Sequence, residues 1–401
     1  MSEKFKGSFT QQEPIPEAAV QAALRVLGHG RLHRYNLEPD EAGEVALLEQ
    51  EFAALTGAKY CLAVASGGYA MATAMRALGV GPGDKVLSNA FTLAPVPGAI
   101  ASLGAVPVLV EVTDDLTIDL SDLKEKIQTS GARILLLSHM RGHICDMDRM
   151  VEICTEANVR VIEDCAHTMG AKWNGVASGR HGVVACYSTQ TYKHLNSGEG
   201  GLLICDDPDI MARATLLSGS YMLYGRHLAT PPAAAFDAVK YDTPNISGRM
   251  DNLRAAILRP QLRDLGAQCA AWNERYGVVQ AGLRGTPGLT VIERIEKEGF
   301  VGSSIQFLLD GWGTEDVGDV LSRSAARGVE LKWFGGEEPI GFTSKYDSWR
   351  YFSTAPMPQT ERVLAGLLDM RLPLTFSLQD CELVARIIRA EVSAVYQNST
   401  A

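Results

Sequence analysis

An acid at the end of an apolar stretch and a lysine farther along the chain have a spacing that suits cofactor chemistry. The segment Val161–Asp164 predicts a strand that ends in a carboxylate, so Asp164 is expected at the strand's carboxyl end, where open α/β sheets bind their ligands. A carboxylate there can keep a pyridinium nitrogen protonated, and Lys193 can form a Schiff base with an aldehyde. The pair therefore predicts a site for pyridoxal phosphate.

Neither residue would carry this prediction alone. An isolated Asp at a strand end is usually a turn or helix cap, and an isolated Lys is usually a solvated charge. The neighbouring residues favour the cofactor site over these ordinary roles, because Ser188 precedes Lys193 by five positions and the glycine-rich run 198–201 follows it. The Ser188 hydroxyl can bond a phosphate, and glycines let the backbone approach a ligand closely.

With these motifs the chain resembles the DegT/StrS family of sugar aminotransferases, which are pyridoxal phosphate enzymes of the fold type I architecture. The resemblance runs from about Arg34 to the carboxyl-terminal helix. The family's motif around the acid is matched by Glu163, Asp164, Ala166, His167, Gly170, Ala171, Gly175, Gly179, Gly182 and Ser188.

The resemblance implies a role for each of these site residues. Lys193 would form the Schiff base with the cofactor and shuttle protons. Asp164 would pair with the pyridine nitrogen, His167 would contact the ring, and Ser188 would bind the phosphate.

A second motif lies upstream, where Ser66, Gly67 and Gly68 precede a helical pattern from Tyr69 to Leu78. Free N–H groups and the positive end of the helix would face a phosphate there. The family has Thr where this chain has Gly68, so one hydroxyl donor is missing and the backbone would bind more of the phosphate.

The family covers the pyridine ring with an aromatic side chain, and counting from Gly67 and Gly68 places that position on Leu93. A leucine can cover the ring by dispersion but lacks aromatic geometry. Phe91 is the alternative ring contact, although its pattern favours a core residue.

The family also has a segment whose arginine reaches the phosphate in the partner subunit. Arg249 matches this arginine, whereas Ser247 stands where the family has Asn. The resemblance therefore implies a homodimer with active sites at the interface.

Composition limits the partners, the location and the kinds of site that the protein can have. The 401 residues are 46% hydrophobic with a net charge of −10, which argues against nucleic-acid and anionic-membrane partners. No stretch is long and apolar enough to span a membrane, and the amino terminus lacks a signal-peptide pattern, so a cytoplasmic location is expected. No metal site is predicted, because cysteines and histidines lack metal-ligand spacing. The cysteines, expected to be buried and reduced, are Cys61, Cys145, Cys154, Cys165, Cys186, Cys205, Cys269 and Cys381.

The pattern of elements predicts an α/β fold with a mostly parallel central sheet, helices on both faces, and a smaller α+β carboxyl-terminal domain. The expected domains are 1–265, with an amino-terminal arm of about 1–40, and 266–401. A long helix is expected from Arg249, with a kink at Pro260, and the run Thr230–Ala235 is expected to be a loop. The predicted strands are Lys85–Leu87, Val106–Glu111, Ile134–His139, Val159–Asp164 and Gly201–Cys205.

The resulting hypothesis is an aminotransferase that moves an amino group from L-glutamate or L-glutamine to a keto- or aldehydo-sugar, a nucleotide-sugar or a cyclitol. Three alternatives remain open: a cofactor-binding regulatory protein without turnover, a sugar dehydratase, and a cysteine desulfurase. Lys193 argues against the dehydratase, since those relatives carry histidine there. Cys381 lies in a helical pattern, which argues against the desulfurase. Acceptor selection is expected from loops 219–230 and 332–349.

Overall fold

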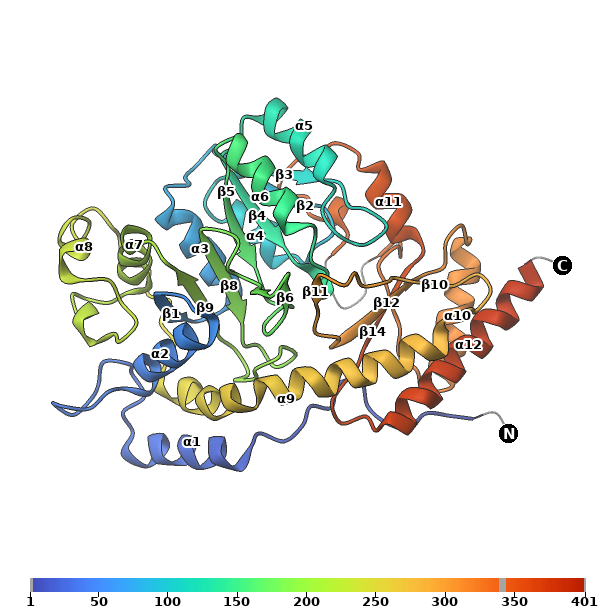
Figure 1. Cartoon of the computed structure of the whole chain (residues 1–401), viewed down its shortest axis with the longest axis horizontal. Helices are drawn as coiled ribbons and strands as arrows, with labels where there is room; N and C mark the ends of the chain where they lie inside the picture. Colours follow the sequence, from blue (N-terminus) through green and yellow to red (C-terminus); the bar gives the residue numbers. More distant parts are fainter. Residues whose placement is uncertain (1–2, 339–343, 400–401) are drawn as a thin grey trace.

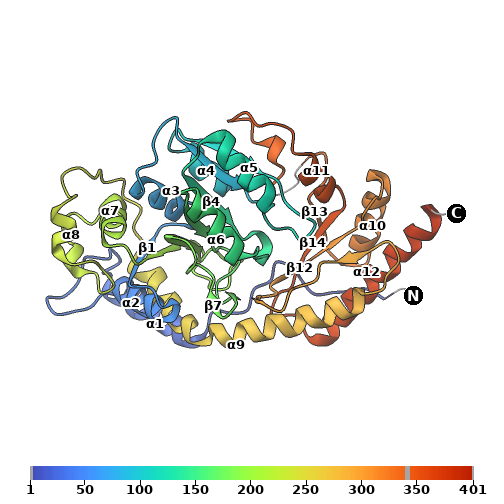
Figure 2. The same cartoon turned by 45° about the horizontal axis from the view of Figure 1, so that its top comes forward.

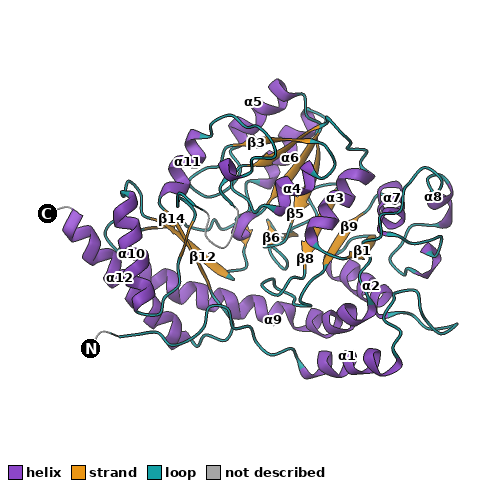
Figure 3. Cartoon of the chain, turned by 180° about the vertical axis from the view of Figure 1, so that it is seen from behind, coloured by secondary structure: helices purple, strands orange, loops and turns teal. Residues whose placement is uncertain are grey.

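The computed structural model describes residues 3–338 and 344–399. A large sheet wrapped by helices and a smaller sheet lie at the two ends of one long helix, α9 (Asn252–Leu283) (Figure 1). Viewed from behind, the strands of the large sheet and those of the smaller, four-stranded sheet lie apart along α9 (Figure 3).

The large sheet is mostly parallel, as predicted. Within the described residues it has seven strands, and β9 alone runs against its neighbours β1 and β8. All five predicted strands are present, with ends shifted by no more than two residues. In sheet order the strands are β1 (Tyr60–Val64), β9 (Gly201–Cys205), β8 (Val184–Ser188), β5 (Arg160–Asp164), β4 (Ile134–Ser138), β2 (Lys85–Asn89) and β3 (Val106–Val110).

Both faces of the large sheet are covered because its strands are apolar on both sides. In β4, for example, Ile134 and Leu136 pack into one core while Leu135 and Leu137 pack into another, as the alternation of side chains along a strand requires. The first face is covered by α3 (Gly67–Ala77), α4 (Pro95–Ala101) and α7 (Pro208–Ser218). The second is covered by α2 (Glu44–Thr56), α5 (Leu120–Ser130), α6 (Met147–Glu156) and the first half of α9.

The small sheet is antiparallel in the order β10-β12-β14-β13 and has two unlike faces. Its apolar face packs on the second half of α9 and on two further helices. Phe5 and Phe9, from the amino-terminal segment, join this core. The elements are β10 (Thr290–Val291), β12 (Ser304–Leu308), β13 (Lys332–Trp333), β14 (Leu367–Arg371), α10 (Thr314–Ala326) and α12 (Leu378–Ser399).

Helix α9 joins the two sheets without interruption. It packs against α1 (Glu17–His29) and α2 at one end and against α12 at the other (Figure 2). Pro260 lies inside this helix. The expected domain boundary at residue 265 therefore falls within a continuous helix, and the division of the chain stays a prediction.

Some shorter elements complete the chain, and one corrects an expectation. The expected loop Thr230–Ala235 is wrong in its second half, because α8 (Ala233–Asp237) begins there. Pro231 and Pro232 fix the backbone just before three alanines, which favour helix. The rest are α11 (Pro358–Ala365), β6 (Lys172–Trp173), β7 (Val176–Ala177), β11 (Glu298–Gly299) and the short 3₁₀ turns Met140–Gly142, Tyr224–Arg226 and Tyr346–Ser348.

Among the described residues, no helix is both long and apolar enough to cross a membrane.

Candidate active site

The structure brings most of the predicted site residues together at one edge of the large sheet. Asp164 is the last residue of β5, Ser188 is the last residue of β8, and Gly67 opens α3 directly after β1. Carboxyl ends of parallel strands meet at the same edge, so these groups converge although they are far apart in sequence. Lys193 follows β8 in the turn that leads to β9.

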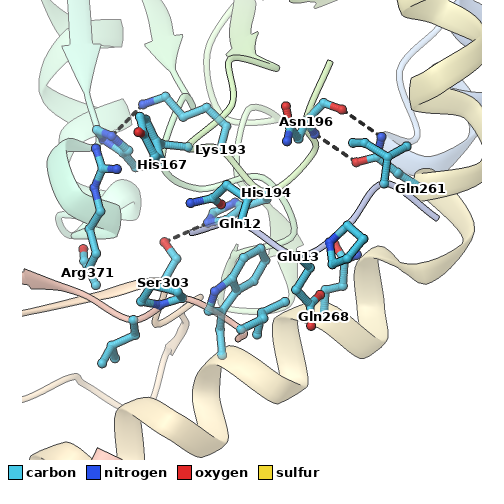
Figure 4. A pocket seen from close by; sticks show the side chains of 18 of the residues that line it. Gln12, Glu13, His167, Lys193, His194, Asn196, Gln261, Gln268, Ser303 and Arg371 are labelled. Atoms are coloured by element: carbon cyan, nitrogen blue, oxygen red, sulfur yellow. Dashed lines mark hydrogen bonds between the residues drawn. The ribbon is translucent and has the colours of Figure 1, made fainter. Parts of the chain in front are cut away.

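The amine of Lys193 has a lowered pKa. Burial, opposed by Asp164 and reinforced by nearby cations, lowers its pKa from 10.5 to about 7. Its Nζ lies 2.7 Å from Nε2 of His167 (Figure 4). Near neutral pH a large share of this side chain is therefore an uncharged amine, which can act as a nucleophile or a base.

His167 is held in one orientation by the backbone. The N–H of Arg141 donates to its Nδ1 at 3.2 Å, so the ring proton of the neutral imidazole belongs on Nε2, facing Lys193. Burial, followed by the Lys193 and Arg141 charges, keeps the pKa of His167 well below its ordinary value. Arg141 adopts a left-handed backbone conformation, with φ of 55°, which is uncommon for a residue with a side chain.

Asp164 is a buried carboxylate that two donors hold in place. Its Oδ2 accepts from Oγ of Ser138 at 2.9 Å, and its Oδ1 accepts from the N–H of Ala166 at 3.1 Å. Ser138 in turn accepts from Oγ1 of Thr92 at 2.8 Å. Sequence reasoning did not single out Ser138, although its place at the end of β4, next to β5, was the available signal.

The start of α3 forms a cradle beside Ser188. The Ser66 side chain caps the helix by accepting from the N–H of Tyr69 at 3.1 Å, while the first-turn N–H groups of Gly67 and Gly68 have no intrahelical acceptor. A Cβ on Gly67 would lie 3.0 Å from Cβ of Ser188, whereas one on Gly68 would meet nothing closer than 3.8 Å. Only Gly67 is therefore required by close packing.

Phe91 and Leu93 occupy different environments. Phe91 is fully buried and packs edge-to-face on Phe334, with ring centroids 5.0 Å apart. Leu93 is partly exposed at the rim of the same apolar cluster. Of the two, Leu93 is the one whose side chain remains accessible to a ligand.

Arg249 lies in a segment that pairs with β1. Its backbone bridges to Val64, and its Nη1 donates to the carbonyl of Gly219 at 2.9 Å. The guanidinium also lies 5.0 Å from the ring centroid of Tyr221. This describes Arg249 within one chain, and its contact with a partner subunit stays a prediction.

Three charged residues near Lys193 were missed by sequence reasoning. Arg141 forms a buried ion pair with Asp369 of β14 at 2.9 Å, and Arg371, two residues farther along β14, extends toward His167 (Figure 4). Charges two apart in an otherwise apolar strand lie on the same face, and this was the signal in the sequence.

One group of possible metal ligands occurs among the described residues, formed by His139, Glu163 and Cys165. The Glu163 carboxylate already accepts from the N–H groups of Gly179, His181 and Gly182, at 2.9, 2.8 and 2.7 Å, and it lies 3.1 Å from Nε2 of His139. These contacts give the buried Glu163 carboxylate a structural role, which is to anchor the loop before β8.

All eight cysteines are free, as expected; Cys269 is partly exposed and the others are buried. Of the two loops expected to select the acceptor, 219–230 includes the turn Tyr224–Arg226, and part of 332–349 lies outside the described residues.

Comparison with known proteins identifies the family. The dTDP-3-amino-3,4,6-trideoxy-alpha-D-glucose transaminase of Streptomyces venezuelae is 33% identical over 291 residues, covering 71% of this chain and 69% of that protein. The 3-amino-5-hydroxybenzoate synthase of Amycolatopsis mediterranei is 33% identical over 250 residues, covering 61% of each. A crystal structure of 3-amino-5-hydroxybenzoic acid synthase matches with a TM-score of 0.82 and 25% identity, covering 98% of this chain and 100% of that one. The family model matches residues 21–390, and the chain therefore belongs to the DegT/DnrJ/EryC1/StrS aminotransferase family, whose members use pyridoxal phosphate.

Proposed function

We propose that this enzyme transfers an amino group from L-glutamate or L-glutamine to the carbonyl of a sugar, a nucleotide-sugar or a cyclitol. The relative from Streptomyces venezuelae is named a transaminase of a nucleotide-linked sugar, which supports the acceptor class. The observation that carries the proposal is Lys193, whose pKa is lowered to about 7 and whose amine lies 2.7 Å from His167.

The residues at the sheet edge fit pyridoxal phosphate. The phosphate would lie between Ser188 and the first turn of α3, where Ser66, Gly67 and Gly68 present backbone and hydroxyl groups. The close approach of Gly67 to Ser188, 3.0 Å from a Cβ placed on Gly67 to the Ser188 Cβ, leaves little space for a side chain, as suits a tight phosphate cradle. When bound, the cofactor supplies an aldehyde for Schiff-base formation and a ring that withdraws electrons from the carbon beside it.

Asp164 and His167 would hold the ring. The carboxylate of Asp164, oriented by Ser138 and Ala166, would keep a proton on the pyridine nitrogen. His167 would contact the ring from its fixed orientation. Leu93, at the accessible rim of its apolar cluster, would cover the ring by dispersion.

Lys193 would act as the proton carrier of the reaction. Its uncharged Nζ would take a proton from the donor's α-carbon and return it at the carbon of the cofactor's former aldehyde group. Because the pKa is close to neutral, the same atom can both accept and release this proton at physiological pH.

The proposed functional unit is a cytoplasmic homodimer. Large apolar side chains are exposed in the loop that contacts Arg249: Tyr221, beside the Arg249 guanidinium, is 60% exposed, and Met222 is 51% exposed. Exposed large apolar side chains of this kind suit a protein interface. Arg249 would reach the partner's phosphate from this surface, and the eight free cysteines suit a reducing compartment.

Three measurements test the proposed function. Borohydride reduction of the holoenzyme followed by peptide mapping should label Lys193, and a label on another lysine would contradict the assignment. The cofactor absorbance should change when glutamate is added, whereas a spectrum indifferent to every amino donor would favour a binding protein without turnover. Mass spectrometry over a panel of keto-sugars should then identify the aminated product.

A further inference from the structure

The turn that holds His167 has an unusual residue at its first central position. The N–H of His143 donates to the carbonyl of Met140 at 3.2 Å, and the two residues between them, Arg141 and Gly142, have φ angles of 55° and 81°. These are the features of a type I′ turn, which favours Asn, Asp or Gly at its central positions. Gly142 satisfies this preference, whereas the left-handed conformation is unfavourable for Arg141.

This conformation determines how the turn contacts His167. A Cβ on Gly142 would lie 3.2 Å from the carbonyl oxygen of His167, so the turn packs directly against the segment that carries this histidine. The N–H of Arg141 donates to Nδ1 of His167 at 3.2 Å, and Nε2 of the same ring lies 2.7 Å from Nζ of Lys193. A right-handed Arg141 would reorient the peptide groups of the turn, and the ring would lose the donor that fixes it.

A side-chain contact with the small sheet offsets the cost of this conformation. Nη2 of Arg141 lies 2.9 Å from Oδ2 of Asp369, and the two side chains are 8% and 0% exposed. Nε2 of Gln306 fixes the carboxylate by donating to its Oδ1 at 2.7 Å. Breaking a buried ion pair leaves uncompensated charges, which costs more than one left-handed residue does. The ion pair is therefore strong enough to keep Arg141 left-handed.

The acid of this pair and Lys193 belong to different sheets. Asp369 lies on β14 between two residues of the apolar core, so its side chain is on the opposite face of the small sheet. Lys332 of β13 is its register partner, and Arg371 follows two residues along β14; these three residues make up the charged face of the small sheet. Through Arg141, this face contacts the turn beside Lys193.

We propose that Asp369 is a positioning residue for Lys193. Its ion pair with Arg141 holds the turn in the left-handed conformation, and the turn aims His167 at the lysine. The role in amino transfer rests on the proposed function, whereas the geometry requires neither cofactor nor substrate.

Hydrogen exchange of the apoenzyme tests what holds the turn. The amide of residue 141 is protected while it donates to His167, and mass spectrometry with fragmentation measures its protection factor. Asp369→Asn keeps the hydrogen bond from Gln306 and removes the charge, so it should lower this protection about tenfold.

Two double variants isolate the backbone conformation, since neither contains an unpaired charge of this ion pair. Arg141→Gly with Asp369→Asn should keep the protection of the wild type, because glycine adopts the left-handed region freely. Arg141→Ala with Asp369→Asn differs by one methyl group and should lose about tenfold.

Competitive acetylation of the apoenzyme, followed by peptide mapping, tests whether the turn acts on the amine of Lys193. The Nε2 proton of His167 stabilises the uncharged amine, so loss of this bond should raise the pKa of Lys193. We expect this pKa to be about 0.5–1 pH unit higher in the Ala double variant than in the Gly double variant. The other charges that act on Lys193 are the same in both variants: Asp164, Arg371 and Lys332.

Asn174 provides the matched control. It is exposed in the turn between β6 and β7 and is also left-handed, with φ of 48°. Asn174→Gly and Asn174→Ala should give the same pKa for Lys193 as the wild type.

Two results overturn the inference. Equal protection in the two double variants would mean that other contacts hold the turn, such as the one between Nε2 of His143 and Oε1 of Gln306 at 2.8 Å. Unequal protection with an equal pKa of Lys193 would mean that the turn does not act on the lysine. Near-ultraviolet circular dichroism checks folding, and if Asp369→Asn alone does not fold, the two double variants decide.

The glutamate half-reaction separates this inference from the proposed function. With pyridoxal phosphate bound, its pH profile should differ between the two double variants by the same shift as the pKa of Lys193. Identical profiles despite a shifted pKa would overturn the positioning role. If glutamate reacts with none of the proteins, the wild type included, the proposed function fails, while the apoenzyme measurements still decide whether Asp369 positions His167.

Discussion

Replacing Lys193, the proposed catalytic lysine, should make the apoenzyme more stable at neutral pH. Lys193 has a pKa lowered from 10.5 to about 7, so the unfolded chain binds more protons than the folded chain between these two values. Stability of the wild type should therefore rise with pH across this window, because the cost of the buried charge is fully present below pH 7 and absent above 10.5. Lys193→Met keeps the size of the side chain and removes the charge.

The magnitude follows from the same two pKa values. At about 1.36 kcal/mol per pH unit, and with the folded amine half protonated at pH 7, the charge costs about 4 kcal/mol at pH 7 and about 1.4 kcal/mol at pH 9.5. Loss of the hydrogen bond to His167 would offset about 1–3 kcal/mol of the gain. That loss varies little with pH, since the pKa of His167 is already far below 7. The stability difference between variant and wild type should thus shrink by roughly 3 kcal/mol from pH 7 to pH 9.5.

Urea denaturation of both apoenzymes at the two pH values measures this difference. Lys124→Met is the control, because Lys124 is exposed on α5, and its effect should be the same at both pH values. A difference between Lys193→Met and wild type that does not change with pH would refute the argument, since it would mean that the folded and unfolded chains protonate this lysine alike.

Three further substitutions test the proposed cofactor contacts. Asp164→Asn should lower the rate of the glutamate half-reaction by orders of magnitude and leave part of the cofactor binding, because it removes the negative charge that stabilises the protonated pyridine ring. Stopped-flow rates within tenfold of wild type would mean that another group keeps the ring protonated. Gly67→Ala should weaken pyridoxal phosphate binding in a fluorescence titration, since its Cβ would press on Ser188 at 3.0 Å, whereas Gly68→Ala, with 3.8 Å of clearance, should not; equal effects would contradict the cradle. Leu93→Phe should tighten cofactor binding by about 0.5–1.5 kcal/mol through stacking, and a lowered melting temperature with unchanged cofactor affinity would show that Leu93 does not cover the ring.

The sequence predicts most of the large sheet and the places of its candidate site residues, because both depend on local patterns. Asp164 ends an apolar run that favours a buried strand, and the glycine at position 67 precedes a helical period. The strands β1 and β8 were not predicted, since a short apolar run does not by itself distinguish a buried strand from a buried helix segment.

The charged face of the small sheet could not be predicted in the same way. Lys332 and Arg371 are far apart in sequence, and only the pairing of β13 with β14 brings them onto one face. Arg141 joins them through a buried ion pair with Asp369 that no spacing rule anticipates. Such contacts depend on strand register, which is a property of the folded sheet and not of either segment alone.

The side chains of the small sheet alternate between an apolar face and a face that lines cavities, and this has a consequence for enzyme engineering. Its apolar face packs against α9 and α12, while Ser304, Lys332 and Arg371 on the other face line cavities. Libraries restricted to positions 304, 332 and 371 would therefore vary the cavity lining without disturbing the core packing. Lys193 is carried by the other sheet, so a lineage could exchange one acceptor for another through a few such positions and keep its amino-transfer chemistry throughout.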